Sequence, residues 1–138
     1  MCELCELAVP PVYRDNKLSV ILVDDANYPG FCRVVWNEHV KEMSDLNPAE
    51  RALLNESVYR VELALREVMA PAKVNLASLG NVVPHLHWHV IPRFADDAQF
   101  PGPVWAPALR QTGEATLASR RALLPRLAAA IERRMSKH

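Results

Sequence analysis

Three histidines at alternate positions, His85, His87 and His89, are the residues of this chain whose types and spacing are best suited to chemistry. Side chains of an extended strand alternate between its two faces, so the three imidazoles are predicted to project from one face. The apolar side chains between them would then project from the other face. Because imidazole titrates near neutral pH, such a row can transfer protons, attack an electrophile or bind a metal ion.

Two kinds of reaction fit this row. In a zinc hydrolase, two histidines and a third ligand would hold a metal ion that lowers the pKa of a bound water. The outer histidines, His85 and His89, would lie about 13 Å apart at Cα, so three ligands for one zinc ion are disfavoured. In the second reaction, His87 attacks phosphorus, its neighbours hold the phosphate oxygens, and water releases the covalent intermediate. A backbone carbonyl or Asn75 would fix the tautomer of His87 for this attack.

The length and charge of the chain restrict its partners. With 138 residues it is long enough for one domain with its own core. Its 16 basic and 16 acidic residues cancel, and no run of like charge indicates binding to nucleic acid or to a membrane surface. It also lacks a signal-like start and an apolar stretch of about 20 residues. We therefore expect a cytoplasmic protein that holds any anionic ligand through local groups.

The pattern of apolar residues and turn signals predicts five strands and a long helix. The strands are expected at residues 12–13, 18–23, 31–36, 73–79 and 85–91. The helix should begin with a capping box at Asn47 and with Pro48 at its first position, and it should end before Pro71. Its apolar stripe consists of Leu54, Val58, Val61, Leu65 and Val68.

The last third of the chain is predicted to be irregular and then helical. A proline-rich segment over residues 95–112 should be ordered, with Phe100 and Trp105 as its anchors. A C-terminal helix over about 114–135 should bend or split at Pro125. Together with a core over about residues 1–94, these segments would make one domain, 1–138. The expected fold class is α+β, an antiparallel sheet of about five strands with a long helix and a C-terminal helix packed against it.

The stretch from His85 to Ile91 resembles the signature of the histidine triad (HIT) superfamily, His-φ-His-φ-His-φ-φ with φ apolar. Pro92-Arg93 is similar to a common extension of that motif. The order of elements over residues 1–94 is also similar to the family's: a hairpin, a Pro-Gly turn, a strand ending in a histidine, a long helix and two strands. The resemblance implies a HIT-like fold and a small nucleotide-binding enzyme. It also implies a homodimer in which Trp105 lies near the partner's site.

The resemblance further implies roles for the histidines and for an acidic residue. His87 corresponds to the nucleophile, and His85 and His89 to the neighbours that bind the phosphate and orient the ring. Asp24 resembles the ribose-binding acidic residue of the family. Asp25 is nearly as good a match, and Asp24 can also be read as a simple turn residue.

Two asparagines complete the nucleotide-binding candidates. Asn81 stands where many family members have a glutamine near the scissile phosphate, and Asn75 matches an asparagine on the preceding strand. Either could instead satisfy the backbone around Gly80. Val82 departs from the family pattern, because it lacks the hydroxyl that holds or protonates the leaving group in several relatives. The leaving group therefore stays open.

Cys2 and Cys5 have the Cys-x2-Cys spacing that can grip zinc. His39 and His85 are the candidates for two further ligands, and the resemblance supports them, because some bacterial HIT proteins with an N-terminal Cys-x2-Cys close a zinc site in this way. Four protein ligands leave no open position, so such a zinc ion would be structural. The alternative is a frayed terminus without metal. Cys32 is predicted to be a buried hydrophobic residue.

The function implied by the resemblance is that of a nucleotide hydrolase or nucleotidyl transferase. It would act at the α-phosphate of a nucleoside phosphoramidate or dinucleoside polyphosphate through a covalent His87 nucleotidyl intermediate. The expected ligand is a purine nucleotide or dinucleotide, and no cofactor is required for catalysis. Two alternatives stay open: a nucleotide-binding regulatory protein with little turnover, and a zinc-dependent hydrolase that uses the histidines as ligands.

Overall fold

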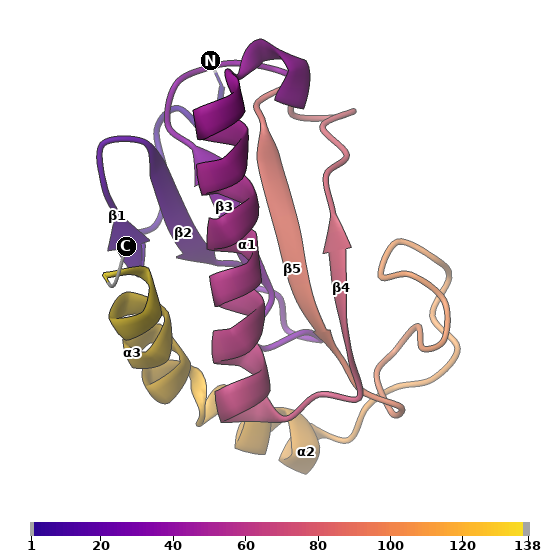
Figure 1. The fold of residues 1–138 in the computed structure, drawn as a ribbon. Coiled ribbons are helices and arrows are strands. Elements are labelled where there is room, and N and C mark those ends of the chain that lie inside the picture. The colour runs from indigo at the N-terminus through magenta and orange to yellow at the C-terminus, as the bar shows by residue number, and fades with distance from the viewer. Residues whose placement is uncertain (1, 137–138) are drawn as a thin grey trace.

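The chain forms a five-stranded antiparallel sheet with two helices packed on one face (Figure 1). The computed structural model describes residues 2–136. The strands are β1 (Tyr13–Arg14), β2 (Leu18–Leu22), β3 (Cys32–Trp36), β4 (Lys73–Ala77) and β5 (His87–Arg93). Their order in the sheet is β1-β2-β3-β5-β4, so β5 lies between β3 and β4. The predicted α+β architecture is confirmed.

The long helix α1 (Pro48–Met69) begins as the sequence predicts. The Asn47 side chain accepts the backbone N–H of Glu50 at 2.8 Å, and the Glu50 carboxylate accepts the backbone N–H of Asn47 at 3.0 Å. These two bonds complete the capping box. The helix ends where Ala70 adopts a left-handed conformation, with φ 46°, ahead of Pro71.

The C-terminal helix is divided into α2 (Glu114–Arg121) and α3 (Leu124–Met135), which confirms the expected split. Pro125 lies in the first turn of α3, where its missing N–H costs no helical hydrogen bond. α3 packs beside α1 and contacts β1, whereas α1 lies across β3 and β5 (Figure 1). A short 3-10 turn, Met43–Asp45, precedes α1. No helix within residues 2–136 is both long enough and apolar enough to span a bilayer.

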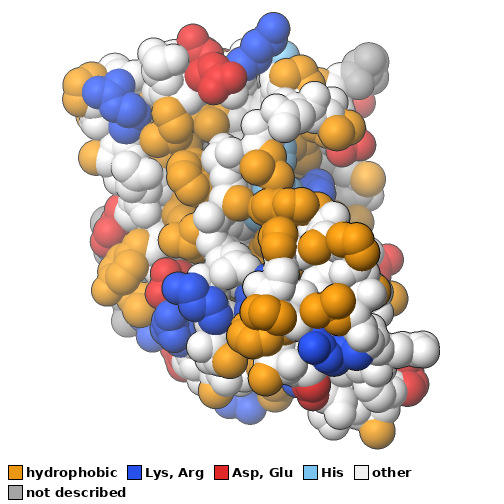
Figure 2. All heavy atoms as spheres, turned by 90° about the vertical axis from the view of Figure 1, so that its right-hand side faces the viewer, with side chains coloured by type: hydrophobic (Ala, Val, Ile, Leu, Met, Phe, Trp, Pro, Cys, Tyr) orange, Lys and Arg blue, Asp and Glu red, His pale blue; other side chains and the backbone are white. Residues whose placement is uncertain are grey.

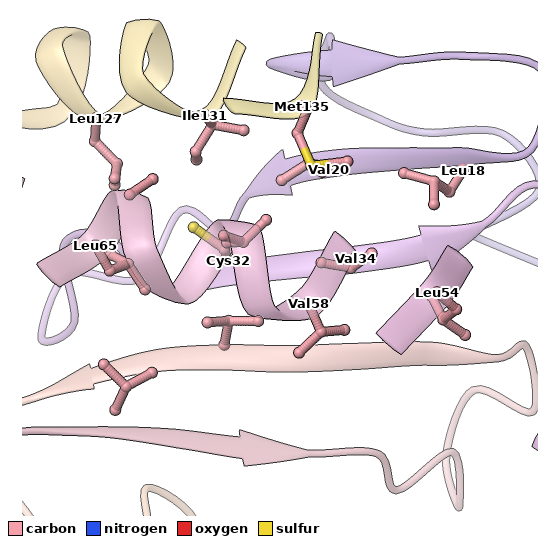
Figure 3. Packing of buried hydrophobic residues seen from close by; sticks show 14 of the residues in the cluster. Leu18, Val20, Cys32, Val34, Leu54, Val58, Leu65, Leu127, Ile131 and Met135 are labelled. Atoms are coloured by element: carbon pink, nitrogen blue, oxygen red, sulfur yellow. The ribbon is translucent and has the colours of Figure 1, made fainter. Parts of the chain in front are cut away.

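The main core lies between the sheet and these helices (Figure 3). The predicted stripe of α1 supplies one side: four of its residues are at most 5% exposed, and Val68 packs at the margin. The sheet and α3 supply the other sides, through Leu18, Val20, Cys32, Val34, Val90, Leu127, Ile131 and Met135. Cys32 is fully buried as predicted, and burial raises the pKa of its thiol to about 12.

The histidine strand begins at His87, two residues after its predicted start. The N–H of His85 donates to the carbonyl of Val83 at 2.8 Å in a tight turn. The ladder between β3 and β5 has its first pair at Val35 and His87. His85 therefore precedes the strand, because a local turn bond takes the place of a ladder bond there.

The same strand continues past its predicted end, through Pro92 to Arg93. The β3 ladder ends opposite Val90, so beyond that residue β5 pairs with β4 alone. A proline, which has no N–H to donate, is tolerated in a strand with one free side. The other predicted strands are present, with ends shifted by one or two residues.

The face of the sheet opposite the helices carries two smaller apolar clusters. At one end, the N-terminal segment packs Leu4 against Ile21 of β2 and Val35 of β3. At the other end lies a cluster of Tyr28, Phe31 and Ile91. These clusters leave a strip of the sheet between them for polar side chains.

A buried ion pair holds the irregular segment after β5, residues 94–113. Arg93 and Asp97 are at most 2% exposed, and the guanidinium donates to both carboxylate oxygens at 2.8 and 3.0 Å. The same carboxylate accepts the backbone N–H groups of Phe94 and Phe100 at 3.0 and 2.7 Å. Burial alone raises the pKa of Asp97, but the guanidinium and these N–H groups hold it below its usual value.

Only one of the two aromatic anchors predicted for this segment contributes. The Phe100 ring lies 5.6 Å from the Arg93 guanidinium carbon. Trp105 is 61% exposed, so its prediction as an anchor is wrong. An irregular backbone needs acceptors for its N–H groups, and the buried Asp97 carboxylate supplies them where an aromatic ring cannot.

Arg93→Met should destabilise the fold by about 3 kcal/mol or more, because it leaves the Asp97 carboxylate buried without a counter-charge. Arg121→Met, which removes an exposed ion pair with Glu114, should cost less than about 1 kcal/mol. Chemical denaturation of the two variants measures the difference.

A double variant separates the charge from the packing. In Arg93→Met/Asp97→Asn no unpaired charge stays buried, so part of the lost stability should return. If Arg93→Met and Arg121→Met cost the same, the buried pair does not organise the segment.

Candidate active site and metal cluster

His87 and His89 project from the strip between the two apolar clusters. Their ring centroids lie 5.0 Å apart, with an angle of 82° between the planes. In the ladder between β3 and β5, His87 is opposite Val35 and His89 is opposite Arg33. The His89 ring also packs edge-on against Phe31, with centroids 5.4 Å apart. These two imidazoles share one face, as the alternation of a strand predicts.

The tautomer of His87 follows from one hydrogen bond. Its Nδ1 lies 2.5 Å from the backbone carbonyl oxygen of His85. A carbonyl oxygen only accepts, so Nδ1 carries the proton, and the lone pair of the neutral ring is on Nε2. Asn75, the other group considered for this role, instead accepts a hydrogen bond from Arg93 at 2.7 Å.

Burial keeps both imidazoles uncharged. It is the largest cause that lowers the pKa of His87; the hydrogen bond to His85 opposes it, and the positive charge of Arg33 adds to it. Burial likewise lowers the pKa of His89 to about 4, with further contributions from His87 and Arg33. Both rings are therefore neutral at physiological pH, the state in which Nε2 of His87 can act as a nucleophile.

The His85 ring contacts the N-terminal cysteines and His39. Its Nε2 lies 2.5 Å from the carbonyl oxygen of Trp36, so Nε2 carries the proton and the lone pair is on Nδ1. That Nδ1 lies 3.4 Å from Cys2 Sγ, 3.5 Å from Cys5 Sγ and 3.1 Å from His39 Nδ1. The predicted strand start at His85 is wrong, because this residue precedes β5 in a turn.

These four side chains have the donors and the spacing of a zinc site. One ligand atom from each of Cys2, Cys5, His39 and His85 lies within 4.8 Å of all the others. Tetrahedral zinc, with bonds of about 2.0 to 2.3 Å, sets its ligand atoms about 3.3 to 3.8 Å apart. The four hydrogen-bond-length separations within the cluster run from 3.1 to 3.5 Å. The group fits a zinc ion with two sulfur and two nitrogen ligands, which leaves no open position.

Asp24 lies where a ligand can reach it. It is exposed just after β2, and its carboxylate makes no hydrogen bond or ion pair within residues 2–136. Together with Arg33 and apolar side chains of the N-terminal segment, it lines a cavity of about 200 Å³. Asp25, the alternative ribose-binding residue, accepts the backbone N–H of Asn27 at 2.9 Å and forms a turn. Of the two carboxylates, Asp24 is the free one.

Neither of the two asparagines predicted for the site is hydrogen-bonded to the histidine pair within residues 2–136. Asn75 is half-buried on β4, opposite Ile91 in the ladder, and its side chain is bonded to Arg93. Asn81 is exposed in the loop between β4 and β5, where no hydrogen bond connects it to the histidines in the described part of the chain. Val82, in the same loop, is 93% exposed.

Two polar residues beside the histidines lie outside the motifs of the sequence. Arg33 lies directly across from His89 and is the one charged residue of β3. A single charge inside an apolar strand is a signal that could have found it. Ser78 donates its hydroxyl to the carbonyl of His87 at 2.8 Å. No sequence pattern distinguishes this serine, because its role depends on how the loop meets β5.

Known proteins share this sequence pattern. Residues 8–96 match the HIT domain family model. The asymmetrical bis(5'-nucleosyl)-tetraphosphatase of Schizosaccharomyces pombe is 32% identical over 88 residues, which are 59% of this chain and 48% of that protein. This chain thus spans about half the length of its curated relative.

Solved structures share the fold. A histidine triad protein from Bradyrhizobium japonicum superposes with a TM-score of 0.72 and 31% identity, over 91% of this chain and 90% of that one. A zinc-bound histidine triad family protein from Mycobacterium smegmatis gives a TM-score of 0.59 and 24% identity, over 94% and 96% of the two chains, a likeness of fold. The family model spans well over half of the sequence and includes all of β5 with its histidines. This chain therefore belongs to the HIT domain family.

Proposed function

We propose that this protein is a nucleotide hydrolase or nucleotidyl transferase that acts at the α-phosphate of a nucleoside phosphoramidate or a dinucleoside polyphosphate. The observation that carries the proposal is the hydrogen bond from His87 Nδ1 to the His85 carbonyl, which leaves the Nε2 lone pair available. Membership of the HIT family supports it, as does the relative named as a tetraphosphatase.

In the proposed reaction the Nε2 lone pair of His87 forms a bond to the α-phosphorus while the bond to the leaving group breaks. The leaving group departs with that electron pair and takes up a proton from solvent. Water then attacks the same phosphorus, the bond to Nε2 breaks, and a nucleoside monophosphate leaves the neutral ring. Such an attack needs positioning more than a strong base, and His89 would donate a hydrogen bond to a nonbridging oxygen.

The positions of the ligand atoms disfavour a hydrolase that uses the histidine row to bind zinc. Within residues 2–136, the metal-type group includes His39 and His85 but neither His87 nor His89. One nitrogen of His87 is also occupied by the His85 carbonyl. The row is divided between two environments, so it does not present three ligands to one ion.

His87→Ala should slow the turnover of adenosine phosphoramidate and of a dinucleoside polyphosphate by at least about 1,000-fold, because the nucleophile is removed. AMP binding, measured by calorimetry, should survive, since His87 is only one of the groups around the nucleotide. His89→Ala, which removes a phosphate contact but not the nucleophile, should have a smaller effect on turnover.

Chelator treatment distinguishes this reaction from the alternatives. Turnover should persist as long as circular dichroism shows that the fold is intact. Loss of turnover on chelation in a Cys5→Ser variant, which already lacks a ligand of the Cys2–His85 cluster, with the fold preserved, would contradict the covalent route. Nucleotide binding without turnover of either substrate would favour a regulatory protein.

We also propose that Cys2, Cys5, His39 and His85 bind a structural zinc ion. The support is the convergence of their ligand atoms, together with the zinc-bound relative from M. smegmatis. A bound ion would fasten the N-terminal segment to the turn before β5. The His85 carbonyl that accepts from His87 belongs to that turn, so the cluster would position the nucleophile without touching the substrate.

Purified wild-type protein should contain about one zinc ion per chain by elemental analysis, and Cys5→Ser should lose most of it and melt several degrees lower. Cys32→Ala changes a thiol in the core, away from the cluster, and should keep its zinc. Equal zinc contents in Cys5→Ser and wild type would show that the cluster is not the binding site.

We propose further that two copies pair through the β4 edge. β4 is the last strand of the sheet, and hydrophobic side chains gather over this side of the molecule (Figure 2). Leu76 is 43%, Leu79 50% and Trp105 61% exposed. A cavity of about 500 Å³ lies beside them, bordered by β4, α1 and the segment after β5. A second copy would cover both the free strand edge and the apolar surface, and it would place Trp105 near the partner's site.

Leu76→Glu should shift the protein from dimer to monomer in sedimentation equilibrium, because it puts a charge into the contact. Val9→Glu introduces the same charge at a residue of equal exposure, 43%, in the N-terminal segment, and should leave the mass unchanged. A wild-type protein that stays monomeric at high concentration would rule out the pairing.

A further inference from the structure

Arg33 occupies the centre of the polar strip, and its side chain makes no hydrogen bond within residues 2–136. It lies in β3 directly opposite His89. Its Nε is buried and lacks a hydrogen-bond partner, and its guanidinium makes no ion pair within residues 2–136. A buried N–H without a partner is costly, and the guanidinium adds four further N–H donors and a fixed positive charge that no residue of the described chain matches.

Arg93, which lies on the same face of the sheet, has a structural role and serves as a comparison. Arg93 donates hydrogen bonds to Asp97, Asn75 and the carbonyl of Gly102, and it is almost completely buried. Arg33 has carboxylates available in the cavity that it lines, Glu3 and Asp24, yet it pairs with neither. Packing and internal pairing therefore do not account for this charge.

The location of Arg33 connects two parts of the site. On one side it borders the cavity of about 200 Å³ whose rim holds the free carboxylate of Asp24. On the other side its charge acts on both imidazoles, since it contributes to the lowered pKa values of His87 and His89. A nucleotide with its ribose at Asp24 and its phosphate at His87 would pass along this guanidinium.

We propose that Arg33 binds the nonbridging oxygens of the phosphate that His87 attacks. This inference rests on the proposed function, and it adds a charged residue that the histidine motif does not contain. A guanidinium can donate two parallel hydrogen bonds to a phosphate, which fixes its orientation as well as its charge. The two histidines are neutral, so they supply hydrogen bonds but no net charge. Arg33 supplies the net charge, and it exchanges no proton during the reaction.

Calorimetric binding of a nucleoside and of its 5'-monophosphate tests this role without any turnover. The adenosine and guanosine pairs are both titrated, and the pair that binds the wild type more tightly is used. Arg33→Met should weaken binding of the monophosphate by about 10-fold or more and change nucleoside binding by less than about 2-fold. Arg33→Lys keeps the positive charge but cannot donate two parallel hydrogen bonds. Its affinity for the monophosphate should lie between those of the wild type and Arg33→Met.

Arg14→Met is the matched control, because it removes the same charge from an exposed residue on the far edge strand β1. It should alter neither affinity. Equal losses for nucleoside and monophosphate in Arg33→Met, no loss at all, or the same loss in Arg14→Met would overturn the assignment.

The same titrations separate this inference from the proposed reaction. A wild-type protein that binds the monophosphate but turns over neither substrate would refute the reaction. The role of Arg33 would still be tested by the affinities of wild type and Arg33→Met for the monophosphate and the nucleoside. A wild type that fails to bind any 5'-monophosphate would overturn the role of Arg33 itself.

Discussion

The hydrogen bond from Nδ1 of His87 to the carbonyl of His85 is the constraint on which the rest of the site depends. It sets the tautomer of the central histidine. The acceptor is a backbone carbonyl, so only the fold of the chain can place it. His85 itself is held on two sides, by the Trp36 carbonyl at Nε2 and by the cysteine and histidine cluster at Nδ1. One residue thus connects the N-terminal segment, the end of β3 and the candidate nucleophile.

The remainder of the fold shields most of the sheet from water and leaves the histidine strip between the covered parts. The helices bury one face of the sheet, and two apolar clusters cover the ends of the other face. The strip between them is buried enough to keep the histidines uncharged. A neutral imidazole is a good nucleophile but a poor counter-charge for phosphate, and in our account the guanidinium of Arg33 supplies that counter-charge.

The elements that local signals specify were predictable from the sequence. The capping box at Asn47 and the apolar stripe define α1, and strand alternation places His87 and His89 on one face. The turn that places His85 ahead of the strand was not predictable, because it replaces a ladder bond with a bond to Val83. The resemblance did indicate that its ring would meet the cysteines and His39, which are distant in sequence. The role of Arg33 depends on its cross-strand neighbour, and pairing between β3 and β5 cannot be read from either strand alone. Similarly, the aromatic side chain of Trp105 predicts a buried anchor, whereas the ion pair of Arg93 and Asp97 holds that segment.

The stereochemical course at phosphorus tests the central claim most directly. A substrate with a chiral α-phosphorothioate is hydrolysed in isotopically labelled water, and the configuration of the product is determined. Two successive in-line displacements, first by His87 and then by water, should give net retention of configuration. Net inversion would mean that water attacks the α-phosphorus directly, and it would contradict a covalent intermediate on His87.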